Sequence, residues 1–463
     1  MKGDKGDPIT SQKMGTAPVG RLLLSMSWPA MLSMMIQALY NVVDTLFISY
    51  TGEAGLTAIT LAQPVQMMMI ALGVGTGIGI NSLIARRLGA QQFDDASRAA
   101  SVGLKLAFFN WSVFVVFGFF FTRPFMALFT ENAAIIEQGT AYLRIVSIGC
   151  LFSMLQISSE KILQSTGNMI LPMMTSLIGA VTNIALDPIL IFGLLGAPKM
   201  GIAGAAAATV IGQAAAMTVV LTMLLRGGHD VRIDWRTKMD RRTLSEIYAV
   251  GGPAILMQAM ASVLNLGMNA VLSRFSDTAV AIMGVYGRMQ SFIFMPVFGI
   301  NQGSTPVFGY NYGARDRGRL MHALRFAILM AAVIMGIGLV LFQTMPQVFL
   351  HWFNASATMM KYGVPAFRII SLCFVPAAFG IVSSGFFSAC GCGVVSLIGS
   401  LLRQLVGALP LAVLFAWLGG IDLVWWCFPA AEGLGIAYYA VKLRSIYRRD
   451  ISRLDGDASQ VQD

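Results

Sequence analysis

Long apolar runs with almost no charge dominate this sequence and restrict the environment in which it can fold. The clearest runs cover residues 22–48, 108–121, 328–342 and 394–418. A helix needs about 20 mainly apolar residues to cross the hydrocarbon core of a bilayer, and several of these runs approach that length. Over the whole chain 56% of the residues are hydrophobic and only 12% are charged, which is too little polar surface for a soluble particle of 463 residues. We therefore expect an integral membrane protein.

The polar breaks between the apolar runs predict about twelve transmembrane helices. Alternating apolar and polar segments of strand length are not found, so an all-α polytopic fold is expected rather than a β-barrel. The expected helices cover residues 21–50, 56–83, 99–122, 139–160, 169–194, 202–225, 243–275, 279–308, 321–345, 363–389, 394–418 and 423–443.

The basic residues indicate how the chain is oriented. With a cytoplasmic N-terminus, most Lys and Arg residues fall on the inside segments, above all in 226–242, 315–325 and 442–453. This distribution follows the positive-inside rule, so both ends are expected in the cytoplasm. The net charge of +10 is thus explained by topology, and no nucleic-acid partner is expected. The polar first residues, followed by a full-length apolar span, do not resemble a cleavable signal peptide.

An internal repeat predicts how the helices are organised. A shift of 224 residues without gaps aligns polar, Gly and Pro residues of the two halves in one register. The matches include Pro29 with Pro253, Asn41 with Asn265, Gln66 with Gln290, Gly89-Ala90 with Gly313-Ala314, and Arg144-Ile145 with Arg368-Ile369. Each repeat holds six spans, so the halves run parallel, as in transporters with two rocking lobes. We expect a tail 1–20, an N-lobe 21–225, a cytoplasmic linker 226–242, a C-lobe 243–443 and a tail 444–463.

Three acidic residues lie well inside expected spans, namely Asp44, Asp187 and Glu432. An ionised carboxylate in the membrane costs about 3 kcal/mol, so each is a functional candidate. Asp44, Asp187 and Thr209 are each expected about 10 Å from the same membrane surface at 1.5 Å per residue. Asn183 lies one turn before Asp187 on the same helix face. Two repelling carboxylates favour a shared proton, whereas these oxygens together suit sodium, so the residues predict a cation site without choosing the ion.

Other polar and methionine side chains in the spans are candidates for a solvated substrate cavity. Glu432 is one of them, although it can instead pair with a neighbour such as Arg403. Methionines suit a site that accepts varied ligands. The candidate cavity residues are Met34, Asn41, Gln66, Met257, Asn265, Asn269, Gln290 and Glu432. No Walker-type motif is present, so no nucleotide or other cofactor is expected beyond the coupling ion.

Several separated motifs resemble the multidrug and toxic compound extrusion (MATE) family. They are the segments 38–44, 183–188 and 201–209, together with the pairs Gly89-Ala90 and Gly313-Ala314. The likeness extends over about residues 15–445 and is strongest to the bacterial branch typified by damage-inducible protein F. It implies two six-helix lobes around a V-shaped cavity in the inner membrane of a bacterium.

The resemblance also implies a function. The expected activity is export of drugs or organic cations, by a monomer, in exchange for protons or sodium. Asp44, Asn183, Asp187 and Thr209 match the family's N-lobe cation site and would be the ligands if sodium is the coupling ion. Residues 253–272 contain no acid where some members have one, so coupling is expected in the N-lobe alone. A lipid-precursor flippase, a channel and a membrane-embedded enzyme are the alternatives, and a flippase should have more mid-span basic residues than Arg288 and Arg403.

Overall fold

A computed structural model describes residues 11–227, 229–449 and 451–453, and the regular elements in this part of the chain are all helices. In the first half the helices are α1 (Gln12–Thr16), α2 (Val19–Ser49), α3 (Glu53–Gly89), α4 (Phe93–Phe120), α5 (Thr122–Ala127), α6 (Ala133–Ser165), α7 (Ile170–Phe192) and α8 (Ile202–Leu225). In the second half they are α9 (Arg241–Leu272), α10 (Asp277–Gly313), α11 (Arg317–Thr344), α12 (Pro346–Trp352), α13 (Ala357–Ser371), α14 (Phe374–Ala389), α15 (Gly393–Leu401), α16 (Leu409–Val424) and α17 (Cys427–Arg449). A π-helical turn, Leu402–Ala408, joins α15 to α16.

Most of the expected spans correspond to single long helices. In the described part of the chain, 10 helices are long and apolar enough to cross a membrane, or 11 if α13 and α14 form one span bent by 46°. The last expected span lies mainly in α17, whose first eighteen residues contain Glu432, Lys442 and Arg444 and so carry more charge than an ordinary lipid-facing helix. It packs against α14 and the π-helical turn, which cover it on one side. The chain is a multi-pass membrane protein.

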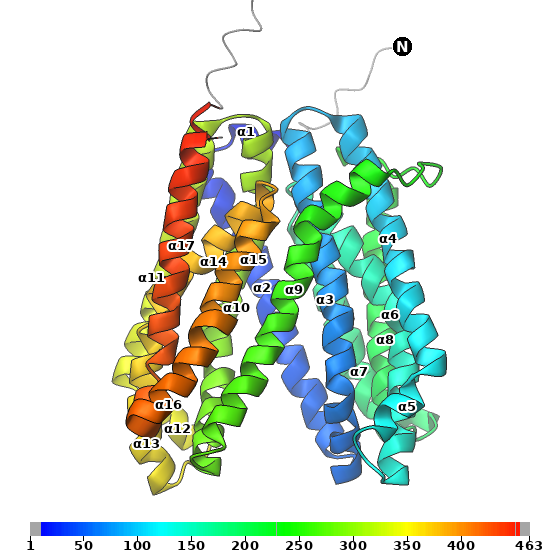
Figure 1. Ribbon diagram of the computed structural model, residues 1–463. Coiled ribbons are helices and arrows are strands. Elements are labelled where there is room, and N and C mark those ends of the chain that lie inside the picture. Colours follow the sequence, from blue (N-terminus) through cyan, green and yellow to red (C-terminus); the bar gives the residue numbers. More distant parts are fainter. Residues whose placement is uncertain (1–10, 228, 450, 454–463) are drawn as a thin grey trace, which may run out of the picture.

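The helices form two bundles that stand side by side (Figure 1). In the N-lobe α6 packs against α3, α4 and α8, while α7 packs against α2 and α8. In the C-lobe α14 packs against α10, α11 and α15. Phe342 and Phe374 are less than 2% exposed and lie edge to face with ring centroids 5.1 Å apart, so burial of large aromatic rings holds this lobe together.

Contacts between the lobes concentrate at one end of the molecule. Helix α1 and the last turn of α17 both lie at this end, which we call the terminal face (Figure 1). Helix α3 packs against α9 and α2 packs against α10. A Cβ atom at Gly89 would overlap the carbonyl oxygen of Tyr310, and one at Gly313 would overlap that of Arg86. Only glycine allows backbones to approach so closely, so these residues seal the terminal face.

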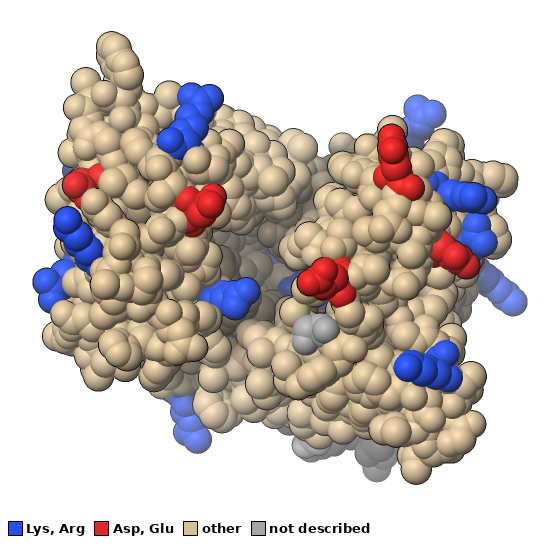
Figure 2. All heavy atoms as spheres, turned by 90° about the horizontal axis from the view of Figure 1, so that it is seen from below, with Lys and Arg blue, Asp and Glu red and all other residues tan. Residues whose placement is uncertain are grey.

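At the opposite end the lobes separate. Viewed from that end, the surface shows two bodies with a deep hollow between them (Figure 2). We call this hollow the cleft. Because the terminal face is sealed while the cleft is open, a solute can enter between the lobes from one side of the membrane only.

Candidate functional site

The four predicted cation-site residues come together inside the N-lobe. Asp187 is fully buried and Asn183 is 2% exposed, both on the face of α7 that contacts α8. The Asn183 side-chain amide donates to the hydroxyl oxygen of Thr209 on α8 at 3.3 Å. Asp44 on α2 is half-buried, and its carboxyl group lies within hydrogen-bonding reach of that of Asp187. Three helices therefore supply one cluster.

Several oxygen atoms of this cluster have no donor. They are Oδ1 of Asp44, Oδ1 of Asn183 and both carboxylate oxygens of Asp187, all buried and without a hydrogen-bond partner in the described structure. Two carboxylates offer each other only acceptors, and leaving buried acceptors unsatisfied costs about 1–3 kcal/mol each. A shared proton would remove the deficit by giving one carboxyl a donor. A sodium ion would remove it by coordinating oxygen atoms, so the residues present fit either ion.

Two tyrosines that sequence reasoning missed complete the cluster. Tyr40 lies one turn before Asp44 on α2, and its hydroxyl group is hydrogen-bonded to that of Thr209. Tyr142 on α6 is close enough to Asp44 for the hydroxyl and carboxyl groups to interact electrostatically. Its hydroxyl oxygen accepts a hydrogen bond from the Gln66 amide at 2.6 Å. Tyr40 could have been predicted, because residues four apart lie on the same face of a helix and Tyr40 is four residues before Asp44. Nothing in the local sequence distinguishes Tyr142 from a packing residue.

A further half-buried acid lies at residue 160, where the fourth span was predicted to end. Helix α6 continues to Ser165, so Glu160 lies within this helix and not at its end. One Glu160 carboxylate oxygen accepts from the Gln156 amide at 3.0 Å and from the Thr175 hydroxyl at 2.9 Å. Glu160 therefore links α6 to α7.

The C-lobe contains a buried ion pair in place of a second carboxylate pair. Glu432 is 6% exposed, and its Oε1 lies 3.5 Å from Nη1 of Arg403 in the π-helical turn. The sequence left two possibilities for Glu432, a place in the substrate cavity or an ion pair with Arg403, and the structure has the ion pair. Glu432 is therefore not a free acid in the cleft. At the spacing of the repeat, Asp44 corresponds to Met268, a fully buried apolar residue. The two lobes thus differ in their charged interiors.

The other residues expected in a substrate cavity differ in how exposed they are. Asn41, Asn265 and Asn269 are exposed, while Met34, Met257 and Gln290 are half-buried. Gln66 points into the N-lobe cluster through its bond to Tyr142, and Met257 accepts a hydrogen bond on sulfur from the Ser400 hydroxyl at 3.2 Å within the C-lobe.

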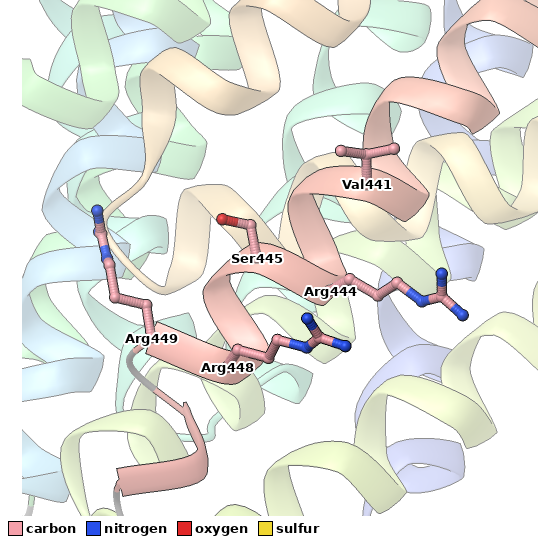
Figure 3. A pocket seen from close by; sticks show the side chains of 5 residues that line it. All are labelled: Val441, Arg444, Ser445, Arg448 and Arg449. Atoms are coloured by element: carbon pink, nitrogen blue, oxygen red, sulfur yellow. The ribbon is translucent and has the colours of Figure 1, made fainter.

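A separate pocket lies at the terminal face, at the end of α17. Val441, Arg444, Ser445, Arg448 and Arg449 line it, and Figure 3 shows Arg444 and Arg448 extending to the same side of the helix. It is remote from the N-lobe cluster, because Asp44 lies near the opposite end of α2. Its arginines belong to the basic segment 442–453 that led us to expect cytoplasmic ends.

Comparisons with known proteins agree with this architecture. The MatE family model matches residues 29–189 and again 253–414, once in each lobe. The FAD transporter of Shewanella oneidensis is 26% identical over 440 residues, which are 93% of this chain and 95% of that protein. The multidrug export protein MepA of Staphylococcus aureus is 24% identical over 422 residues, 90% of this chain and 92% of that protein.

Solved structures match equally well. One, described as the outward-facing conformation of a multidrug resistance MATE family transporter, has a TM-score of 0.88 and 26% sequence identity, and the match covers 98% of this chain and all of that one. Two helical lobes that are sealed at one end and enclose a cleft at the other define a membrane transporter. The chain belongs to the MATE family. Its assignment to the branch of damage-inducible protein F stays a prediction.

Proposed function

We propose that this protein is a secondary active antiporter that exports drugs or organic cations in exchange for protons or sodium. The donor-free oxygen atoms of Asp44, Asn183 and Asp187 carry the proposal, because they need a cation and lie beside the helix that also borders the cleft. The relatives support it, since one of them is a multidrug export protein.

The proposed cycle couples the N-lobe cluster to the lobes through α2. One face of α2 carries Asp44 toward α7, and α2 also packs against α10 of the C-lobe. Pro29 interrupts the hydrogen bonding of α2 and allows it to bend. Neutralising the two carboxylates removes their repulsion, changes how α2 packs on α7, and so changes the angle between the lobes. Opening of the terminal face then exposes the cleft to the other side, which is alternating access.

We further propose that the protein works as a monomer in the inner membrane of a bacterium, with both ends in the cytoplasm. The basic segments at the terminal face support this orientation. The cleft of this conformation then opens to the outside, as expected for release of an exported drug.

Efflux of a fluorescent organic cation from proteoliposomes tests the proposed function. A pH gradient and a sodium gradient are imposed separately on wild type and on Asp44→Asn, which keeps the size of the side chain but removes its charge. We expect one gradient to drive export in wild type and neither to drive it in the variant, with unchanged thermal unfolding in detergent. Gradient-driven export by Asp44→Asn at the wild-type rate would contradict the proposed coupling site.

A further inference from the structure

Helix α10 carries an exposed arginine far from its ends. Arg288 lies eleven residues after the first residue of α10, about 16 Å along the helix axis. Its side chain is exposed in this structure. An arginine that faces the hydrocarbon core of a bilayer costs about 3 kcal/mol or more. The position is therefore favourable only if the side chain faces water.

The helical repeat shows which way Arg288 points. Residues eleven apart complete three turns and share one face of an α-helix, so Arg288 lies on the same face as Gly299. Gly299 touches the N-lobe, because a Cβ atom there would meet the backbone of Met31 on α2. Arg288 therefore faces the N-lobe three turns farther from the terminal face. At Gly284, one turn farther still, a Cβ atom would find no atom within 4 Å. Arg288 thus faces the cleft.

The guanidinium group of Arg288 is not engaged by an acid. Within the described residues it donates no hydrogen bond and joins no ion pair, and its one recorded contact is with the ring of Phe353, 5.9 Å from the ring centroid. The other mid-span arginine, Arg403, is held by Glu432. Arg288 therefore presents a planar fork of N–H donors that is free to bind a ligand, beside an aromatic ring.

The wall across the cleft carries exposed apolar side chains. Continuing outward from Met31 on the same face of α2, Met35 and Val42 are 50% and 61% exposed. On α3, Met68 is 66% exposed and lies seven residues from Gly75, which contacts the C-lobe at Ile255. Asp187 is not on this wall, because its side chain is fully buried. The cleft thus has a cation on one side and soft apolar side chains on the other.

We propose that Arg288 is the anion-binding residue of the cleft and that the chain takes amphiphilic substrates bearing a carboxylate or a phosphate. The oxyanion binds the guanidinium fork in bidentate fashion, and the apolar or aromatic body of the substrate rests on Met35, Met68 and Phe353. This inference rests on the proposed export function and adds molecules with an anionic group, including zwitterionic drugs, to the proposed substrates.

Matched pairs of fluorescent probes test the inference by equilibrium binding to the full-length protein in detergent, without any ion gradient. Rhodamine B bears a free carboxylate that rhodamine 6G has as an ester, and flavin mononucleotide bears a phosphate that riboflavin lacks. In each pair we call the member that bears the oxyanion the anionic probe, and for wild type we expect tighter binding of the anionic probe in at least one pair. Arg288→Gln should weaken that member's affinity about tenfold or more, and should change the affinity of its partner without the oxyanion by less than about twofold.

Two further variants make the result specific. Arg288→Lys keeps the charge but loses the fork, so its affinity for the anionic probe should be intermediate. Arg123→Gln removes an exposed arginine from α5, outside the cleft, and should bind like wild type. Selectivity in the rhodamine pair alone identifies a carboxylate site, and selectivity in the flavin pair alone identifies a phosphate site. Equal weakening of both members of each pair by Arg288→Gln, or no preference for either anionic probe in wild type, would overturn the inference.

The binding result is independent of the coupling result. Asp44→Asn should keep the preference for the anionic probe even where it abolishes gradient-driven export. If gradient-driven export fails but the preference for the anionic probe is intact, Arg288 is the anion site and the antiport proposal is wrong. If export is found without that preference, the antiport proposal stands and Arg288 is not the anion site.

Discussion

At the scale of single residues, Thr209 shows how the N-lobe site is held together. Its hydroxyl group accepts from the Asn183 amide and is hydrogen-bonded to the Tyr40 hydroxyl, so one side chain of α8 connects residues of α7 and α2. A hydroxyl group in this position fixes the amide oxygen of Asn183 near Asp187. The orientation of that oxygen decides whether it can accept a hydrogen bond from a protonated carboxyl group or coordinate a sodium ion.

Thr209→Val tests this role, because valine has nearly the same shape but no hydroxyl group. We expect gradient-driven efflux to fall at least severalfold and the free energy of unfolding in detergent to fall by about 1 kcal/mol. Thr209→Ser restores the hydroxyl group and should recover most of the efflux. Full activity of Thr209→Val would show that Thr209 only packs.

The residues of the site differ in how far they could be predicted. Asp44, Asn183, Asp187 and Thr209 could be placed at one depth because their distances from span ends follow from the helical rise. Tyr142 could not, since its neighbourhood is set by packing of α6 against α3, which the sequence does not display. Arg288 was visible as a mid-span charge, but its direction follows from the contact of Gly299 with α2.

At the scale of elements, the start of α9 illustrates local control of a span. Asp240 caps this helix, and its carboxylate accepts from the backbone N–H of Thr243 at 2.9 Å and from the Thr243 hydroxyl at 3.0 Å. The backbone hydrogen bond lowers the pKa of Asp240 below its usual value. This cap fixes the residue at which the linker 226–242 ends and the transmembrane helix α9 begins.

Asp240→Ala should lower the free energy of unfolding by about 1 kcal/mol at neutral pH, because two donors at the helix start lose their acceptor. Since the pKa is lowered in the folded state, the charged cap stabilises the fold above the unfolded pKa of about 3.9 and loses this effect as the pH falls through the folded value. Thermal unfolding in detergent should therefore show a difference between wild type and variant that narrows at acidic pH. A difference independent of pH would contradict a role for the charge.

The sequence predicted most helices but not their breaks. The span 363–389 is divided by the bend between Ser371 and Phe374, and the span 394–418 contains the π-helical turn at Leu402–Ala408. A proline follows each break, Pro376 in the first turn of α14 and Pro410 in the first turn of α16. Proline has no backbone N–H to donate and disturbs the turn before it, so the sequence carried a local signal at both places that the prediction of continuous spans did not use. The π-helical turn coincides with Arg403, whose pairing with Glu432 depends on the neighbouring α17.

At the scale of the whole molecule, an ion pair crosses the terminal face. Arg87 on α3 lies 2.6 Å from Glu246 on α9, and it also pairs with Asp95 of its own lobe at 2.7 Å. Hydrogen bonds between the lobes accompany it, including one from the Ser82 hydroxyl to the Ser388 carbonyl oxygen at 2.7 Å. These contacts stabilise the conformation in which the cleft is open.

Glu246→Gln removes the ion pair between the lobes while Arg87 keeps Asp95, so the N-lobe should fold normally. A partly exposed pair contributes up to about 1 kcal/mol, so the population with an open terminal face should rise about twofold to fivefold. Spin labels at exposed Gln92 and Arg444 would report it as a longer distance between the lobes. Arg242→Gln, which removes a partner of Glu246 on α9 itself, is the control, and an equal shift in that control would contradict the assignment.

The close glycine contacts at the terminal face are reciprocal. Gly89 meets Tyr310 and Gly313 meets Arg86, and each residue of one contact lies 224 positions from its counterpart in the other. Contacts of this kind are those of a homodimer with twofold symmetry, in which one surface binds its own copy. Joining two such units in one chain lets the shared surface persist while the interiors diverge. The N-lobe can then hold the paired carboxylates Asp44 and Asp187 while the C-lobe holds Arg288. Two identical subunits could not differ in this way.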